Sequence, residues 1–218
     1  MQLEEQVLQT QRYVDFNSQN NSTYSIEYLQ LYLAICSEID VVAKVIIDEA
    51  GIIMGGNTID SWGPALDNVL PGLQIQRVMF NDDYEVQPWK NWNHIKVYSE
   101  KRKKDYWKLA DKCKNPEWWT IYNKVQHQRT TACSPGRSYY TKANLRYVVL
   151  SLAALRILES KYIDMRREPY RANKDIIAVL RVTRGTAFSL ALKRKFVLFY
   201  LFMGYTILVG SNEKLTSS

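Results

Sequence analysis

The stretch YSIEYLQLYLAICSEIDVVAKVIIDEA, residues 24–50, decides the fold class expected for this chain. It follows the polar segment NSQNNST, which supplies an N-cap, and Gly51 comes directly after it. Its apolar residues recur at spacings of four and three: Tyr28, Tyr32, Ile35, Ile39, Val42 and Ile46. This stripe predicts a long amphipathic core helix. Charged residues on this helix, such as Glu38, are expected to face solvent or a neighbouring helix. The alternative is that Glu38 lies near an active site.

Helical signals return in the second half of the chain. A helix is expected from about Ser99 through KRKKDYWKLADKC, with Tyr106 and Trp107 on its apolar face. Asn115-Pro116-Glu117 is a start signal for the next helix, because Asn caps, Pro fits the first helical position and Glu complements the dipole. Residues 140–162 predict another core helix, with its apolar pattern at Leu145, Val148, Val149, Leu152, Leu155 and Leu158.

Glycine and proline punctuate residues 51–98, which predicts an irregular insert between the helices. A short helix at residues 61–70, with Pro64 in its first turn, and one extended segment at residues 73–80 are expected there. His94 is expected to pack among tryptophans. The fold class predicted is therefore mainly α: a helical domain over residues 1–165, followed by a basic, apolar-ended extension over residues 166–218 that packs on it.

Composition limits the cellular setting. The chain has 218 residues, 46% of them hydrophobic, which is enough for one large domain or a domain with an appendage. Its three cysteines are odd in number and show no C-x-x-C spacing, which argues against a disulfide framework and a structural zinc. The N-terminal residues lack the basic and apolar runs of a secretory signal. We expect a cytoplasmic protein without a metal or cofactor.

Charge is distributed unevenly along the chain. Residues 1–100 hold 14 acidic and 5 basic residues, a net of −9, whereas residues 101–218 hold 8 and 24, a net of +16. A polycationic half attracts polyphosphate through counterion release. It equally suits an anionic membrane surface or the acidic half of a second copy, so charge alone leaves these partners open.

The densest group of functional side chains is WWTIYNKVQHQR, residues 118–129. On a helix, Trp118, Tyr122 and Val125 share one face, while Asn123 and His127 share a neighbouring face with Trp119. Asn123 and His127 therefore point at the same object. Alternatively, both satisfy buried backbone groups or pair with Glu38 or Asp40, while the tryptophans fill the core.

These residues resemble the HEPN superfamily of small helical bundles, in which an R-x4-6-H motif, often R-N-x3-H, acts in RNA cleavage. The corresponding string is YNKVQH, residues 122–127, where Asn and His match and tyrosine stands in the arginine position. The helices at residues 24–50 and 140–162 are similar to the flanking helices of HEPN-like proteins from bacterial and phage-defence systems. The resemblance covers roughly residues 20–165.

The resemblance implies metal-independent cleavage of RNA by a homodimer. Such chemistry uses the 2′-hydroxyl as nucleophile, a histidine to move a proton and a cation to stabilise the phosphorane. His127 fits the proton role and Asn123 fits phosphate holding. Arg129 is the nearest cation, but it lies about 200° around the helix from His127. It serves only if the helix frays or a partner chain supplies it, and Arg137 is a further option. The expected RNA-binding residues are Lys124, Arg137, Lys101, Arg102, Lys103 and Lys104.

Two functions remain open at the level of sequence. The first is a toxin-like or phage-defence endoribonuclease, with an antitoxin as a candidate partner. The second is a non-catalytic interaction or nucleic-acid-binding module. The apolar run at residues 196–209 has 14 residues, short of a bilayer span, which favours a buried helix, a strand or a dimer interface over membrane insertion.

Overall fold

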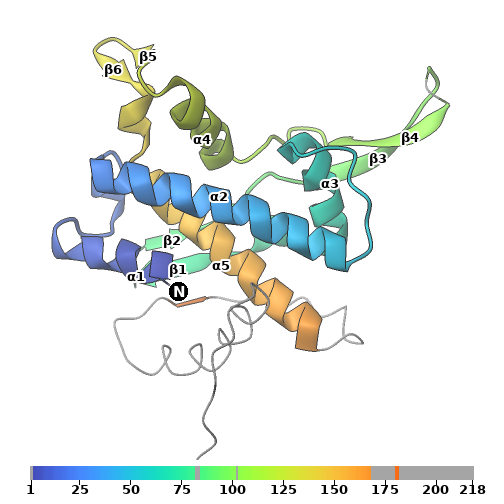
Figure 1. Cartoon of the computed structure of the whole chain (residues 1–218), viewed down its shortest axis with the longest axis horizontal. Helices are drawn as coiled ribbons and strands as arrows, with labels where there is room; N and C mark the ends of the chain where they lie inside the picture. The colour runs from blue at the N-terminus through green and yellow to red at the C-terminus, as the bar shows by residue number, and fades with distance from the viewer. Residues whose placement is uncertain (1, 82–83, 102, 168–179, 182–218) are drawn as a thin grey trace, which may run out of the picture. The chain divides into compact units, whose positions relative to one another are not determined.

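The computed structural model describes residues 2–81, 84–101, 103–167 and 180–181 (Figure 1). All of these belong to one structural unit, Gln2–Val182, and Thr183–Ser218 belong to another. The expected C-terminal extension, apart from residues 166–167 and 180–181, and its apolar run at 196–209 lie outside the described residues. In the part of the chain that is described, no helix has both the length and the hydropathy to cross a bilayer.

Helix α2, Ile26–Glu49, confirms the central prediction. Ser25 caps it by accepting the Tyr28 backbone N–H at 3.0 Å, and Gly51 leaves it with a φ of 71°. All six residues of the predicted stripe are buried. The face of α2 that they form packs along α5, Leu145–Arg167, which confirms the second predicted core helix (Figure 1).

Shorter elements surround this helix pair. The other helices are α1 (Gln2–Gln9), α3 (Ile59–Val69) and α4 (Glu117–Gln128), with 3-10 turns at Thr10–Arg12, Ser18–Asn20, Leu73–Ile75 and Tyr139–Lys142. The strands are β1 (Val78–Asn81), β2 (Tyr84–Val86), β3 (His94–Ser99), β4 (Lys104–Leu109), β5 (Ala132–Ser134), β6 (Arg137–Ser138) and β7 (Leu180–Arg181). Strand β1 pairs antiparallel with β2 and parallel with β7, while β3–β4 and β5–β6 are antiparallel hairpins.

The prediction of a mainly α bundle is therefore wrong, since the fold mixes helices with three small sheets. The largest error is the basic segment after Ser99, which forms the tip of a hairpin and β4 instead of a helix. Six consecutive residues of β3 pair with β4. The backbone hydrogen bonds between the two strands therefore override the helical pattern of apolar residues in the β4 segment. The prediction of an extended segment at residues 73–80 is correct only from Val78 onward, because residues 73–75 form a 3-10 turn.

Five buried tryptophans form the second part of the core. Trp62, Trp89, Trp92, Trp118 and Trp119 come from α3, α4 and the loop before β3. The ring centroids of Trp62 and Trp119 lie 5.3 Å apart, as do those of Trp89 and Trp118, both in edge-to-face geometry. The Trp118 Nε1–H also donates to the Pro88 carbonyl at 2.8 Å. This tryptophan cluster fixes α4 against α3 and the base of β3.

Two polar residues in or beside this cluster, His94 and Asn115, find their hydrogen-bond partners there. His94 is buried, as predicted, and Asp67 accepts both its backbone N–H, at 2.7 Å, and a contact with its Nδ1, at 3.3 Å. Asn115 does not cap α4, which corrects the predicted start signal. Its side chain instead donates to Asp60 and accepts the Nε1–H of Trp92. The start of α4 is therefore fixed by tertiary contacts.

A buried ionic group joins α1 to α5. Arg156 lies 3.5 Å from both Glu4 and Glu159, and its side chain is 8% exposed. Burial raises the pKa of Glu159 to about 7, while the charge of Arg156 lowers it and that of Glu4 raises it. The folded protein therefore binds a proton at Glu159 more tightly than the unfolded chain does.

Replacing a tryptophan of the cluster should destabilise the protein far more than replacing one outside it. Trp118→Ala is expected to lower the free energy of unfolding by about 3–5 kcal/mol, because it leaves a cavity and an unpaired Pro88 carbonyl. Trp107→Ala, at a side chain of the β3–β4 hairpin that is 41% exposed, should change it by less than about 1 kcal/mol. Equal losses in chemical denaturation would contradict this account of the core.

The stability should also depend on pH through Glu159. Its pKa is higher in the folded state than the ordinary 4.5, so the free energy of unfolding should fall as pH rises from about 4.5 to about 7. The fall attributable to Glu159 is on the order of 3 kcal/mol. Denaturation at several pH values should show that Glu159→Gln removes this fall and that Glu85→Gln, at an exposed carboxylate, keeps it. A Glu159→Gln profile identical to wild type would refute the assignment.

Candidate functional site

Helix α4 turns one face to the core and the other to solvent. Trp118, Trp119, Tyr122 and Val125 are buried, as the spacing predicts, and this anchoring fixes the rotation of the helix. Asn123 and His127 are exposed. Since they are four residues apart, they lie on one face of α4 about one turn from each other. The prediction that these two side chains share one face of the helix is therefore confirmed.

Neither polar side chain serves the core. The Asn123 Nδ2 donates to the Trp119 carbonyl at 3.2 Å, a bond within its own helix. The alternative that Asn123 and His127 pair with Glu38 or Asp40 is wrong for the described residues, where Asp40 pairs with Lys44. The rest of that alternative holds in part, because Asn123 does bond the backbone carbonyl of a buried residue and the two tryptophans do fill the core. The imidazole of His127 is thus left facing solvent.

Arg129 does not meet His127 within the chain. It caps the C-terminal end of α4 with helical backbone angles, φ −57° and ψ −33°, so the helix does not fray at His127. Two helical positions then separate the side chains by about 200° around the axis. The expected histidine and arginine pair is not assembled by one chain in this geometry.

The chain turns back directly after α4 through the β5–β6 hairpin. Gly136, with a φ of 70°, makes its turn, and Arg137 pairs with Ser134 at the first position of β6. The backbone N–H of Tyr140 donates to the Arg129 carbonyl at 2.9 Å, which closes the hairpin onto the helix end. The hairpin therefore holds the exposed Arg137 close to the C-terminal end of α4.

After Glu117, the stretch of chain that forms the rest of α4 and the β5–β6 hairpin contains no acidic residue. Between Glu117 and Glu159 the sequence has six Lys or Arg residues and no Asp or Glu. Of the six, Arg146 pairs with Glu117 at 2.9 Å and Arg156 belongs to the buried ionic group. The other four are Lys124, Arg129, Arg137 and Lys142, and none makes an ion pair with another described residue. We call these four residues, with Asn123 and His127, the α4-end surface.

The remaining predicted RNA-binding residues lie elsewhere. Lys101 and Lys103 are at the tip of the β3–β4 hairpin and Lys104 opens β4, all exposed, while Arg102 lies outside the described residues. This hairpin precedes α4 in the chain and β5–β6 follows it, and Figure 1 shows the two hairpins beyond opposite ends of the helix. A helix of 12 residues is about 18 Å long. The sequence-predicted site is thus divided into two separate basic surfaces.

Two exposed aromatic residues of the β3–β4 hairpin are not part of the predicted site. Tyr98 has no predicted role, and Trp107 is expected on the apolar face of a helix where the structure has strand β4. Their exposed fractions are 57% for Tyr98 and 41% for Trp107. The period-two alternation in HIKVYS, residues 94–99, with its β-branched and aromatic residues, is the signal that predicts a strand there.

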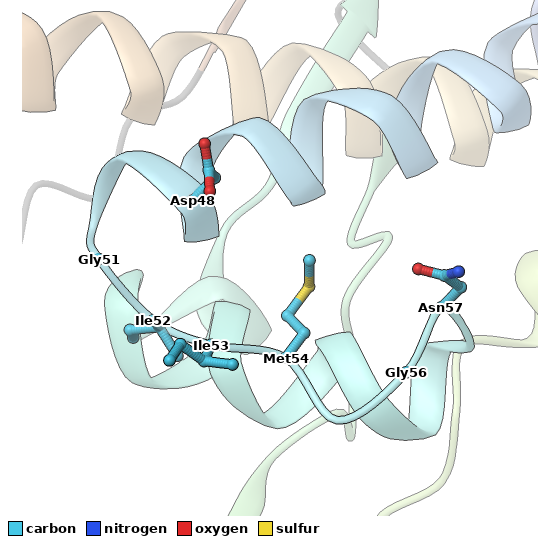
Figure 2. Close-up of a pocket in the computed structure, with 7 residues that line it drawn as sticks. All are labelled: Asp48, Gly51, Ile52, Ile53, Met54, Gly56 and Asn57. Atoms are coloured by element: carbon cyan, nitrogen blue, oxygen red, sulfur yellow. The ribbon is translucent and has the colours of Figure 1, made fainter.

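A cavity of about 410 Å³ lies where α2 leads into α3 (Figure 2). It is lined by Asp48, Gly51, Ile52, Ile53, Met54, Gly56 and Asn57. Asp48 is the one titratable side chain in this lining, so the cavity offers neither an acid–base pair nor a metal ligand set. Throughout the described ranges, no three His, Cys, Asp or Glu side chains gather closely enough to hold a metal ion.

Comparison with known proteins provides no relative for this arrangement. No family model matches the chain, and no curated protein and no solved structure matches it either.

Proposed function

We propose that this protein binds RNA through the α4-end surface. One observation carries the proposal: four cationic side chains without ion-pair partners in the described residues come from α4, its C-terminal end and the turns that follow it, the same part of the chain that exposes Asn123 and His127, and this stretch has no acidic residue after Glu117. Guanidinium and ammonium groups bind phosphate oxygens, and releasing the condensed counterions of RNA favours such binding. The resemblance of YNKVQH to the HEPN motif supports RNA as the polyanion.

A second candidate function is metal-independent cleavage of the bound RNA. It is favoured by the exposure of His127 on the same face as Asn123. In this reaction the RNA 2′-oxygen attacks the adjacent phosphorus, the bond to the 5′-oxygen breaks, and a 2′,3′-cyclic phosphate and a 5′-hydroxyl result. His127 would take the proton from the 2′-hydroxyl or return one to the leaving oxygen. Asn123 would hold a phosphate oxygen.

The cleavage function further requires a cation beside His127. Because Arg129 lies on the opposite side of α4, we propose that a second copy of the chain provides it in a homodimer. The resemblance to HEPN-like defence proteins would make such a ribonuclease a toxin or phage-defence effector that a partner protein holds inactive. Binding without cleavage needs neither the dimer nor this partner.

RNA binding can be tested by the salt dependence of affinity. The Lys124→Ala/Arg137→Ala variant should lose about two phosphate contacts, which lowers the slope of log affinity against log salt by about 1.5. The control is Arg12→Ala/Lys90→Ala, which removes the same charge from exposed positions outside both basic surfaces and should keep the slope. Fluorescence anisotropy with a labelled RNA measures both. Equal slopes for the two variants would exclude the α4-end surface as the binding site.

Cleavage can be tested with purified protein, RNA and a metal chelator. His127→Ala should reduce the rate by about 100-fold or more, and Gln126→Ala, its exposed neighbour, should not. If Arg129 acts across a dimer, mixing equal amounts of His127→Ala and Arg129→Ala chains should restore about a quarter of the wild-type activity, because half of the dimers then contain one complete site. An unchanged rate in His127→Ala would remove the histidine from the reaction.

A further inference from the structure

The β3–β4 hairpin extends beyond the body of the protein. Its register runs over six residue pairs, from His94 with Leu109 at the base to Ser99 with Lys104 near the tip. His94 is buried against Trp92 and α3, whereas most residues beyond it are exposed. Figure 1 shows the hairpin leaving α3 as a two-stranded arm. A ribbon of this kind presents both of its faces to solvent.

The register places chemically different side chains on the two faces. Residues paired across an antiparallel ladder lie on the same face, and the faces alternate along each strand. One face therefore carries Tyr98 opposite Asp105 and Lys96 opposite Trp107. Lys96 and Asp105 form an ion pair at 3.2 Å along one diagonal of this square. Tyr98 and Trp107 occupy the other diagonal of the same face.

Trp107 differs from every other tryptophan in the chain. The other five are at most 6% exposed, whereas Trp107 is 41% exposed. Tyr98 on the same face is 57% exposed. Folding gains little from the parts of these two rings that stay in contact with water. Flat aromatic faces on an arm suit stacking against another planar group.

The positive charge of the arm indicates that the planar group belongs to an anionic ligand. Residues 94–114 contain eight Lys or Arg and three Asp or Glu, a net of +5. Lys101, Lys103, Lys104 and Lys108 are exposed and form no ion pair with a described residue. An alternative role for these lysines is to prevent the exposed strands from pairing with other chains. That role does not explain why exposed aromatic rings lie beside them. By the same register, Lys104 and Lys108 lie on the face opposite Tyr98 and Trp107, while Lys101 and Lys103 lie at the tip that both faces share. A strand that stacks its bases on the two rings can therefore place its phosphates at the lysines of the tip.

We propose that the β3–β4 hairpin binds unpaired nucleotides of RNA, with bases stacked on Tyr98 and Trp107 and phosphates at the lysines of the tip. The proposal rests on the RNA binding proposed above and names its substrate class as single-stranded RNA. Bases within a duplex are stacked on each other and do not offer their faces to these rings. A membrane is a poorer occupant, because an inserting hairpin needs an apolar tip and this tip carries Lys101 and Lys103.

The affinity test compares a labelled 12-nucleotide RNA, designed without self-pairing, with the same strand annealed to its complement. Tyr98→Ala/Trp107→Ala should weaken binding of the single strand about 100-fold, tenfold for each base that loses its stacking partner. Its affinity for the duplex should stay within a factor of two of wild type. Tyr13→Ala, at a tyrosine that is 88% exposed on another part of the protein, should change neither affinity.

Intrinsic fluorescence gives a direct reading of the contact, since Trp107 is the tryptophan exposed to solvent. The single-stranded RNA should quench its emission in the wild type, and Trp107→Phe should remove the signal while retaining most of the affinity. Circular dichroism of each variant verifies that the fold is intact.

Three results would overturn the inference. Unchanged single-strand affinity in Tyr98→Ala/Trp107→Ala, beside a loss in Lys124→Ala/Arg137→Ala, would refute stacking on the arm and leave the proposed RNA binding standing. A wild-type protein that binds neither RNA would end both proposals. Quenching and binding by phosphatidylserine vesicles, without any by RNA, would assign the arm to a membrane surface.

Discussion

Close packing of the five buried tryptophans is the constraint on which both basic surfaces depend. Trp118 and Trp119 fix the rotation of α4, and as a result Asn123 and His127 face solvent. Trp92 lies against His94 at the base of β3, and this contact anchors the arm. Because large rings tolerate little displacement in a packed core, the two surfaces are held by rigid elements. The buried face that anchors α4 and the exposed face proposed to bind RNA therefore lie on the same helix.

The uneven charge along the sequence is partly balanced inside the fold. Glu49 pairs with Arg166 at 2.7 Å and Glu4 with Arg156 at 3.5 Å, so acids of the first half meet bases of the second within one chain. This pairing weakens the case for a second copy as the partner of the basic half. Among the described residues, most of the Lys and Arg side chains without an ion-pair partner belong to residues 94–114 and to the α4-end surface. Those are the places where a polyanion gains most from binding.

Local rules explain why α2, α4 and α5 were predictable and the pairing of β3 with β4 was not. The stripe of α2 and the proline start of α4 depend on residues within a few turns of each other, so a single segment carries the signal. The β3–β4 hairpin depends on which strand faces KDYWKL, residues 104–109, and that segment can also form an apolar helical face. Asn115 shows the same limit, because it is a good cap by residue type and yet bonds Asp60 and Trp92 instead.

The sequence by itself determined the two long core helices, the polar face of α4 and the basic character of the second half, because each follows from residue type and periodicity. Only the tertiary structure decided that the predicted RNA-binding residues form two groups, that α4 stays helical through His127, and that Trp107 is exposed. The physical reason is the same in each case. Distances between segments, and the burial of one ring in preference to another, follow from the packing of all elements together and not from any one of them.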